Sequence, residues 1–522
     1  MVAEPAQGAA RRPRLALAVI SAVLFVTFLD NTIVAVALSS IQSGLHAGIT
    51  QLQWVVNGYA LTFAALMLSF GTLSDHLGRR GVMLGGLAVF AAGSLFGTVA
   101  SSPAQLIAAR VIMGVGAAAS EPGTLSMIRQ LYPDRRERAQ ALGVWSAISG
   151  LALAAGPVIG GLLVGAWSWR GVFAFNVAAG VLAAAGVAAV LPESRDPAGR
   201  RMDLPGFASA ALALSAATFA TIEGETYGYS TWWIALLYAA AAASLLFFAV
   251  QERRADEPVL DLRFFRRGPF AAGMVVAFTG FFATFAVFFF VPLFVQLLGN
   301  ASGFDLAADF LPMAATLITV SALSGRWIAR QGPGLPMAAG GVAAAAGILV
   351  TNAYITPASG PGLLGWSLAI VGAGLGVLMV GATTAVLGAV PGARSGMAAS
   401  AVNTSRELGA VAGVAILGSI VDGQLTTDLL HRLAAIPDLP AALRQTVIVD
   451  VTTGNTSAES GLPKTPFIEH LIKQVTAAAE ASFYSGLDRV LLLAAALTLA
   501  SAFAAALLAA RGRRGPPEVS DA

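Results

Sequence analysis

Two ionisable residues lie deep inside long apolar runs of the sequence. Asp30 is fifteen residues into a run that begins at Leu15, and Arg110 is about six residues into a run that begins at Ala104. At 1.5 Å per helical residue, Asp30 lies roughly 22 Å from the start of its helix and Arg110 roughly 9 Å from the start of its own. The two helices start on opposite sides of the membrane. In a hydrocarbon layer about 30 Å thick, the two reach nearly the same level. A charge at that depth costs several kcal/mol unless it is paired or hydrated, so we expect both side chains to face one central cavity.

An acid beside a base at this depth can bind and release a proton. Arg110 would stabilise the ionised form of Asp30 while the two are close, and a movement that separates them would favour protonation. The alternative is a static ion pair that only joins two helices. Replacing Asp30 by Asn distinguishes the two, because only proton coupling needs a titratable group at this position.

Two further acids lie at membrane depth. Glu121 follows Arg110 by eleven residues, which returns it to nearly the same helix face, and Pro122 beside it interrupts the helix. We expect Glu121 to be a second protonation site or a counter-charge for a cationic substrate; a partner for Arg110 or a lipid-shielded buried acid is the alternative. Glu407 lies near mid-depth of a later run, where pairing with the adjacent Arg406 is the alternative to such a role. Four other acids stand at the ends of apolar runs, where solvation accounts for them: Glu223, Glu225, Asp305 and Asp309.

The elements that must position these groups are membrane-spanning helices. Of the 522 residues, 57% are hydrophobic and 11% are charged, whereas a soluble domain carries about 25% charged residues. Apolar runs bounded by Arg, Pro or Gly clusters predict fourteen helices, at residues 15–41, 52–72, 82–100, 104–128, 139–165, 169–191, 203–222, 232–250, 270–298, 306–328, 335–352, 362–390, 396–421 and 486–510.

The arginines indicate how these helices are oriented. They fall almost entirely in alternate connections and at both ends of the chain. Because positive residues are retained on the cytoplasmic side, an even helix count and cytoplasmic N- and C-termini are predicted. The first run is too long for a signal peptide and has no A-x-A cleavage site, so we expect it to be retained. The sequence thus predicts a multi-pass protein of the cytoplasmic membrane.

Composition also argues against several classes of function. The formal net charge of +3 is small and spread over loops, which disfavours a nucleic-acid partner. There is no cysteine, which excludes disulfides, thiolate metal sites and a cysteine nucleophile. The four histidines are isolated from one another, and no H-E-x-x-H, G-x-S-x-G or G-x4-G-K-[ST] motif occurs. We therefore expect no metal, no cofactor and no enzymatic activity.

Glycine-rich motifs in this sequence resemble those of a known family. The segment between the second and third helices has the pattern G-x-x-x-D-x-x-G-R-R, formed by Gly71, Asp75, Gly78, Arg79 and Arg80. It resembles motif A of the major facilitator superfamily. The fifth helix carries G-x5-G-P-x-x-G-G, with Gly150, Gly156, Pro157 and Gly160, which resembles motif C of facilitator antiporters. Residues 106–116 resemble motif B, and residues 29–38, 169–176 and 403–409 resemble signatures of the fourteen-helix drug:proton antiporter branch.

The resemblance covers most of residues 15–421 and implies an all-α major facilitator fold of two six-helix bundles plus two additional transmembrane helices. An internal repeat of the motif A glycines after the tenth helix supports the two halves. The expected parts are a cytoplasmic tail (1–14), the first bundle (15–191), two inserted helices (192–269), the second bundle (270–510) with an extracellular loop (422–485), and a cytoplasmic tail (511–522). Within that loop, residues 466–481 are a candidate surface helix.

The activity implied is proton-coupled antiport, the export of hydrophobic drugs or antibiotics by a monomer in the lipid bilayer through alternating access. The proton gradient supplies the energy. Proton coupling would fall to Asp30, Arg110, Glu121 and Glu407, and substrate contacts to Asp30, Asn31, Glu121, Asn403 and Glu407. The motif A residues would latch the two halves, and the glycines and proline of the fifth helix would act in gating.

Departures from the family pattern bear on the substrate. Glu121 and Glu407 stand where the family usually has an apolar residue and an amide, which favours cationic substrates. Seven phenylalanines encircle the ninth helix, so we expect most to face lipid and a minority to contact an apolar drug; they are Phe278, Phe281, Phe282, Phe285, Phe288, Phe289 and Phe290. The alternatives are an exporter of one endogenous metabolite, an importer, and a membrane sensor that does not transport.

Overall fold

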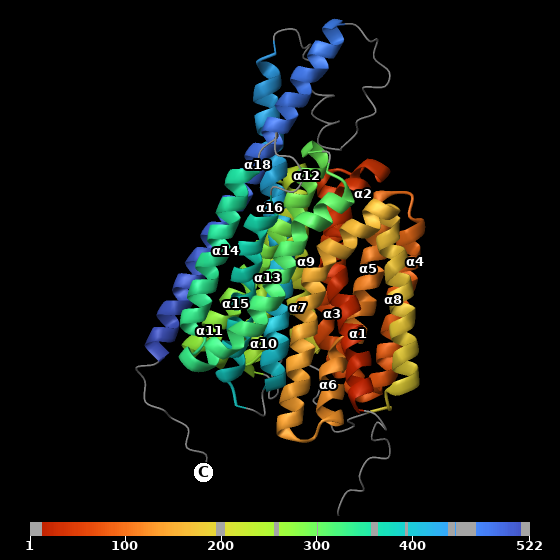
Figure 1. The fold of residues 1–522 in the computed structure, drawn as a ribbon, viewed down its shortest axis with the longest axis vertical. Helices are drawn as coiled ribbons and strands as arrows, with labels where there is room; N and C mark the ends of the chain where they lie inside the picture. The colour runs from red at the N-terminus through yellow and green to blue at the C-terminus, as the bar shows by residue number, and fades with distance from the viewer. Residues whose placement is uncertain are drawn as a thin grey trace, which may run out of the picture.

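The computed structural model describes residues 13–194, 204–254, 260–299, 301–355, 364–391, 395–436, 444 and 466–512. All regular secondary structure in this part of the chain is helical (Figure 1). The first ten helices are α1 (Pro13–Ile33), α2 (Leu38–Leu45), α3 (Ile49–Leu77), α4 (Arg79–Val99), α5 (Pro103–Ser120), α6 (Pro122–Leu131), α7 (Arg135–Ala166), α8 (Trp169–Val190), α9 (Leu204–Tyr227) and α10 (Trp232–Arg254). The others are α11 (Gly268–Phe285), α12 (Val291–Gly299), α13 (Gly303–Gln331), α14 (Gly334–Tyr354), α15 (Gly365–Gly388), α16 (Ser395–Ala434) and α18 (Pro466–Gly512). Three short segments are η1 (Ala35–Ala37), η2 (Leu262–Arg266) and the π-helical η3 (Ala286–Phe290).

The long helices correspond one to one with the apolar runs of the sequence. Among the described residues, thirteen stretches are long and apolar enough to cross a membrane. Some of these stretches join two elements, such as Pro13–Leu45, which combines α1, η1 and α2. Helix α3, with 29 residues, occupies the place of the second predicted run and completes the set. The predicted all-α membrane fold is confirmed.

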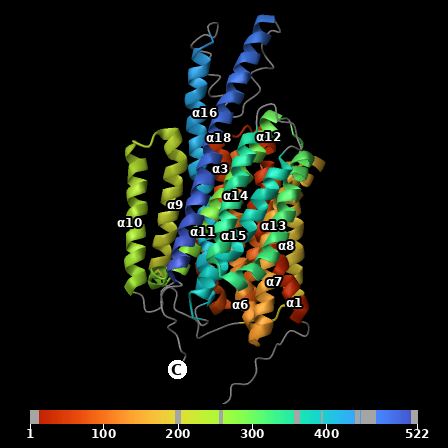
Figure 2. The same cartoon turned by 60° about the vertical axis from the view of Figure 1, so that its left-hand side comes forward.

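The helices form two bundles, with a further pair beside them. Helices α1 and α3–α8 pack on one another in the first bundle, and α11, α13–α16 and α18 in the second. The bundles meet where α7 packs on α13 and where α3 packs on α16. Helix α9 contacts both α3 and α16, and α10 packs on α9 at the edge of the molecule (Figure 2). The additional pair therefore lies along one seam between the bundles.

We call the end of the molecule where α1 begins and α18 ends the terminal end, and the opposite end the distal end. Helices α16 and α18 rise beyond the others at the distal end (Figure 1). There Leu429 and Leu433 of α16 cluster with Ala478 of α18. The segment 422–485, expected as a loop, is thus helical at residues 422–434 and 466–485, and the candidate surface helix is the start of α18. Residues 437–443 and 445–465, like residues 1–12 and 513–522 of the expected tails, lie outside the described residues.

Three of the membrane-spanning stretches are interrupted. Helix α1 gives way to the 3-10 turn η1, α5 ends just before Glu121 and Pro122, and η3 separates α11 from α12. Pro122 has no N–H to donate, which explains the break between α5 and α6. Segments η1 and η3 contact each other across the bundles. Irregular backbone at membrane depth is tolerated only inside protein or along a water-filled cavity, so these breaks mark the interior between the bundles.

The phenylalanines of the ninth membrane helix lie inside the protein, and the expectation that most face lipid is wrong. Those at positions 281, 282, 285, 288, 289 and 290 are at most 3% exposed, and Phe278 is partly buried. The cause is the position of α11, which packs against α15, α16 and α18. Rings on every side of this helix therefore meet other helices.

Candidate functional site

Asp30 and Arg110 meet in the interior of the first bundle, at the common level that their positions in the sequence predict. Nη1 of Arg110 donates to Oδ2 of Asp30 in an ion pair, and both side chains are fully buried. Oδ1 of Asp30 accepts a hydrogen bond of 2.6 Å from Nδ2 of Asn176 on α8. The carboxylate is thus held by side chains from α5 and α8, so its charge is compensated on both oxygens.

The guanidinium of Arg110 is fixed by α3 as well as by Asp30. Its Nε donates to the backbone oxygen of Val55 at 2.8 Å, and its Cζ lies 4.4 Å from the ring centroid of Tyr59. The hydroxyl of Tyr59 in turn donates to the backbone oxygen of Thr27 on α1 at 2.8 Å. Four helices, α1, α3, α5 and α8, therefore share one buried network, in which a cation, an aromatic face and a carboxylate satisfy each other.

Asp30 lies in the last turn of α1, directly before the break at η1. The break is held by α7: Oγ1 of Thr32 donates to the backbone oxygen of Leu153 at 3.0 Å. A Cβ added to Gly156 would lie 1.9 Å from Thr32 Oγ1, and one added to Gly160 would lie 2.6 Å from the backbone oxygen of Ile33. Only glycine allows α7 to approach α1 this closely. The glycines of the fifth membrane helix thus position the acid-bearing turn.

Gly150 and Pro157, the other motif residues of α7, differ from Gly156 and Gly160 in their surroundings. A Cβ added to Gly150 would meet no atom within 4 Å, so this glycine is not required for packing against α1. Pro157 lies inside α7, next to the contact at Gly156. The motif therefore combines close contacts at Gly156 and Gly160 with one open position at Gly150.

Glu121 lies at the break between α5 and α6 and is buried. Its backbone oxygen accepts a hydrogen bond of 2.6 Å from Oγ1 of Thr124, which itself accepts one of 3.0 Å from the indole N–H of Trp145 on α7. Its carboxyl group has no hydrogen-bond partner among the described residues. Glu121 does not pair with Arg110, whose partner is Asp30.

Glu407 connects the two bundles. Its Oε1 accepts a hydrogen bond of 3.4 Å from Nδ2 of Asn31, the residue that follows Asp30. The adjacent Arg406 points to α15 instead, where it donates to Oγ1 of Thr383 at 2.6 Å, and it also contacts Asn403 Oδ1 at 3.3 Å. The two neighbours on α16 thus have partners on different helices.

We refer to Asp30, Asn31, Tyr59, Arg110, Asn176 and Glu407 as the central polar cluster. Sequence reasoning placed four of these residues in the site and missed Tyr59 and Asn176. Asn176 ends the motif at 169–176, which was a signal for it. Tyr59 gave no signal, because an aromatic residue is unremarkable in an apolar helix. Among the described residues, no group of three or more His, Cys, Asp or Glu side chains could hold a metal ion.

The motif A arginines bind within the first bundle. Nη1 of Arg79 donates to Oγ of Ser194 at 2.8 Å, and Nη2 of Arg80 donates to the backbone oxygen of Ala188 at 2.5 Å. Gly78, with a φ of 117°, makes the sharp turn between α3 and α4 that glycine allows. The side chain of Asp75 lies outside the described residues. The arginines therefore hold the end of α8 against this turn.

Asp305 and Asp309, two of the acids expected at the ends of apolar runs, differ in burial. Asp305 is partly exposed and forms a capping box with Ser302 at the start of α13, as expected for a solvated acid. Asp309 is buried, and solvation does not account for it. It lies one turn further into α13, where this helix packs against α15.

The chain is similar to known proteins along most of its length. Residues 20–414 match the model of the Major Facilitator Superfamily. The multidrug resistance protein Stp of Mycobacterium tuberculosis is 34% identical over 92% of this chain and 89% of its own length. The methylenomycin A resistance protein of Streptomyces coelicolor is 32% identical over 78% of this chain and 85% of its own length. The tetracenomycin C resistance and export protein of Streptomyces glaucescens is 31% identical over 80% of this chain and 77% of its own length.

Solved structures share the fold at lower sequence identity. An inward-facing, unoccupied bacterial homolog of the human lysosomal transporter Spinster superimposes with a TM-score of 0.59 at 16% identity, covering 98% of this chain and all of that one. Tetrameric PepTSo2 gives a TM-score of 0.60 at 14% identity, covering 96% and 100%. Because the family model matches residues 20–414 and a relative is 34% identical over 92% of the chain, the chain belongs to the major facilitator superfamily.

Proposed function

We propose that this protein is a proton-coupled antiporter that exports hydrophobic drugs or antibiotics, cationic ones among them, across the cytoplasmic membrane by alternating access. The observation that carries the proposal is the adjacency of two contacts on α1. Asp30 is paired with Arg110 inside the first bundle, and the next residue, Asn31, contacts Glu407 of the second bundle. A movement between the bundles would therefore act on the turn that holds the ion pair.

The coupling follows from the cost of an unpaired buried charge. While Asp30 contacts Arg110 and Asn176, its ionised form is compensated. If α1 moves away from α5, the carboxylate loses its counter-charge in a site with little water, which costs several kcal/mol and favours uptake of a proton. Return of α1 would release that proton. Rocking of the bundles would thus be linked to proton binding at one oxygen atom.

In this mechanism the substrate would contact the acids at the bundle interface. Glu407 and Glu121 are both buried acids, so a cation beside either would offset the cost of burying its charge. A cation that attracts Glu407 would also compete with its weak hydrogen bond from Asn31. Asn403, which contacts Arg406 one turn before Glu407, is a further candidate contact. The termini would lie in the cytoplasm, which makes the distal end the extracellular one.

The names of the relatives support drug export and favour a second candidate. One relative is named for multidrug resistance, and two are named for resistance to a single antibiotic each, methylenomycin A and tetracenomycin C. An exporter dedicated to one endogenous metabolite is therefore the second candidate. Export of several unrelated dyes and antibiotics would support the first, and export of one chemical scaffold alone the second.

Transport in inverted membrane vesicles tests the proposal. An imposed pH gradient should drive dye accumulation by the native protein, and addition of dye should release protons from the vesicles. Asp30→Asn should abolish both, whereas Asp305→Asn, at a partly exposed helix end, serves as the matched control and should retain both. Amounts of protein in the membrane are equalised for the comparison. Undiminished proton-linked transport by Asp30→Asn would remove the proposed coupling group.

A further inference from the structure

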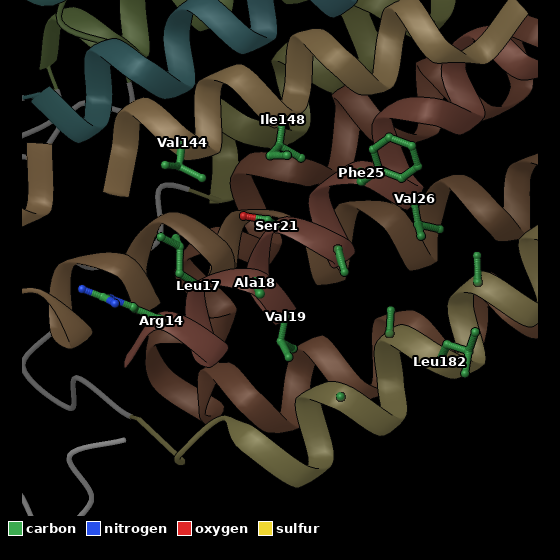
Figure 3. Close-up of a pocket in the computed structure, with 14 residues that line it drawn as sticks. Arg14, Leu17, Ala18, Val19, Ser21, Phe25, Val26, Val144, Ile148 and Leu182 are labelled. Atoms are coloured by element: carbon green, nitrogen blue, oxygen red, sulfur yellow. The ribbon is translucent and has the colours of Figure 1, made fainter. Parts of the chain in front are cut away.

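A pocket of about 660 Å³ opens on the side of the first bundle, and none of the central polar cluster lines it (Figure 3). Its walls come from α1, α7 and α8 and are apolar except for Arg14 and Ser21. Two residues at its rim, Leu182 and Val144, are 73% and 45% exposed. In a membrane-spanning bundle such residues face lipid, so the pocket is open to the hydrocarbon of the bilayer.

The pocket exists because α1 and α7 separate towards the terminal end. Their close contact is at Gly156 and Gly160, near the end of α1. About two and three turns earlier in α7, Ile148 and Val144 line the pocket wall opposite α1. The side chains of α1 that face them, such as Ala18 and Ala22, are too small to fill the space. The wedge between the helices therefore leaves space for a ligand.

The dimensions of the pocket fit an acyl chain. Its lining on α1 runs from Arg14 to Val26, which are twelve helical steps apart. At 1.5 Å per residue this is about 18 Å, against roughly 15 Å for half of a hydrocarbon core that is about 30 Å thick. Arg14 marks one end of the pocket, and Val26 and Leu182 lie towards the other (Figure 3). The pocket thus extends through about one leaflet.

The two polar groups fit the head of a lipid. Arg14 lies in the first turn of α1, is exposed, and has no hydrogen bond or ion pair to any described residue. A guanidinium at this level binds a phosphate readily. Oγ of Ser21 is buried, and in the described part of the chain it has no hydrogen-bond partner although Ser21 lines the pocket. An unsatisfied hydroxyl beside an apolar channel is suited to an ester oxygen below a phosphate.

We propose that this pocket binds an anionic phospholipid from the leaflet at the terminal end. Its phosphate contacts Arg14, an ester oxygen accepts from Ser21 Oγ, and an acyl chain fills the wedge between α1 and α7. A lipid in this place supports α1 from the side opposite the bundle interface. The site is separate from the proposed transport pathway, and its test does not depend on transport.

Native mass spectrometry of the full-length protein, released from detergent with added lipid, tests the proposal. Phosphatidylglycerol should be retained about fivefold more strongly than phosphatidylcholine with the same acyl chains, since one surface arginine contributes about 1 kcal/mol to binding of an anionic lipid. Arg14→Gln should remove this preference. Ala18→Trp should fill the pocket and remove retention of both lipids.

Two matched variants on α10 serve as controls. Arg254→Gln removes an exposed arginine at the terminal end of another helix, and Leu245→Trp places the same tryptophan side chain on a different exposed apolar face. Both should retain the lipid preference of the native protein, and thermal unfolding should show that all four variants are folded. Unchanged retention in both Arg14→Gln and Ala18→Trp would overturn the proposal. Displacement of phosphatidylglycerol, mole for mole, by a transported dye would also overturn it and assign the pocket to substrate.

Discussion

The two bundles hold their buried charges in different ways. In the first, Arg110 and Asp30 neutralise each other, and Asn176 and Tyr59 complete the network from neighbouring helices. In the second, Arg406 and Glu407 are adjacent in sequence, yet Arg406 donates to neutral groups and Glu407 accepts from Asn31 of the other bundle. The first arrangement is self-contained, whereas the second is complete only when the bundles touch.

This difference suggests a division of tasks between the bundles. Helix α15, the counterpart of α5 if the halves repeat, contains no charged residue. The rings of α11 and η3 give the second bundle an apolar interior. We infer that the first bundle provides the proton site, and that the second provides an apolar surface with one acid that responds to contact between the halves.

The largest effect on stability and export is expected when the buried arginine of one bundle or the other is replaced by leucine. Arg110→Leu leaves the Asp30 carboxylate buried without a counter-charge, which typically destabilises a protein by about 3–5 kcal/mol. Arg406→Leu leaves only neutral acceptors on Asn403, Thr383 and Met379, at a cost of about 1–3 kcal/mol. We therefore expect a larger fall in melting temperature, and complete loss of pH-driven export, for Arg110→Leu.

Thermal unfolding in detergent and vesicle transport measure this pair of variants side by side. Adding Asp30→Asn to Arg110→Leu should restore part of the stability but no transport, because the stranded charge is removed together with the proton site. Equal losses of stability for the two arginine variants would show that the bundles do not differ in the way described.

The next largest effect concerns the contact between α7 and α1. Gly156→Ala places a methyl group 1.9 Å from Thr32 Oγ1, so α1 must move and the turn that carries Asp30 moves with it. We expect at least a tenfold loss of export. Gly150→Ala on the same helix meets no atom within 4 Å and improves helix propensity by up to about 1 kcal/mol. It should transport like the native protein, and a comparable loss in both variants would mean that flexibility of α7, not its contact with α1, sets the rate.

A smaller effect is expected for Asn176→Ala. This change removes the hydrogen bond to Oδ1 of Asp30 but leaves the ion pair with Arg110 in place. A hydrogen bond to a charged group contributes about 1.5–3 kcal/mol, so the ionised form of Asp30 loses part of its stabilisation. The pH at which export is half-maximal should therefore rise, with the maximum rate retained. An unchanged pH profile, measured with internal pH clamped, would show that Asn176 only supports packing.

Much of this site could be predicted because an α-helix rises by a constant distance per residue. Counting residues from the helix ends placed Asp30 and Arg110 at one level, and the structure joins them. The direction in which a side chain points around the helix could not be obtained in this way, and so the contact of Asn31 with Glu407, 376 positions away, was not foreseen. The burial of the α11 rings was missed because phenylalanine is equally compatible with lipid and with a protein interior. The helical residues 422–434 of α16 were missed because they are too polar to appear as a membrane span, whereas the start of α18 was expected as a surface helix at residues 466–481.

The smallest effect, and the sharpest test of the division between the bundles, concerns Glu407. The amide in Glu407→Gln keeps an acceptor for Asn31, so stability should change by less than about 1 kcal/mol, as is usual when a hydrogen bond is preserved. Removing the negative charge should lower export of a cationic dye about fivefold and leave export of a neutral dye unchanged, because only the cation gains from the charge. The exposed Glu137→Gln, at the start of α7, is the matched control and should affect neither dye. If Glu407→Gln instead abolished proton release with every substrate, the second bundle would share in proton coupling, and the two bundles would be more alike in function than their contacts indicate.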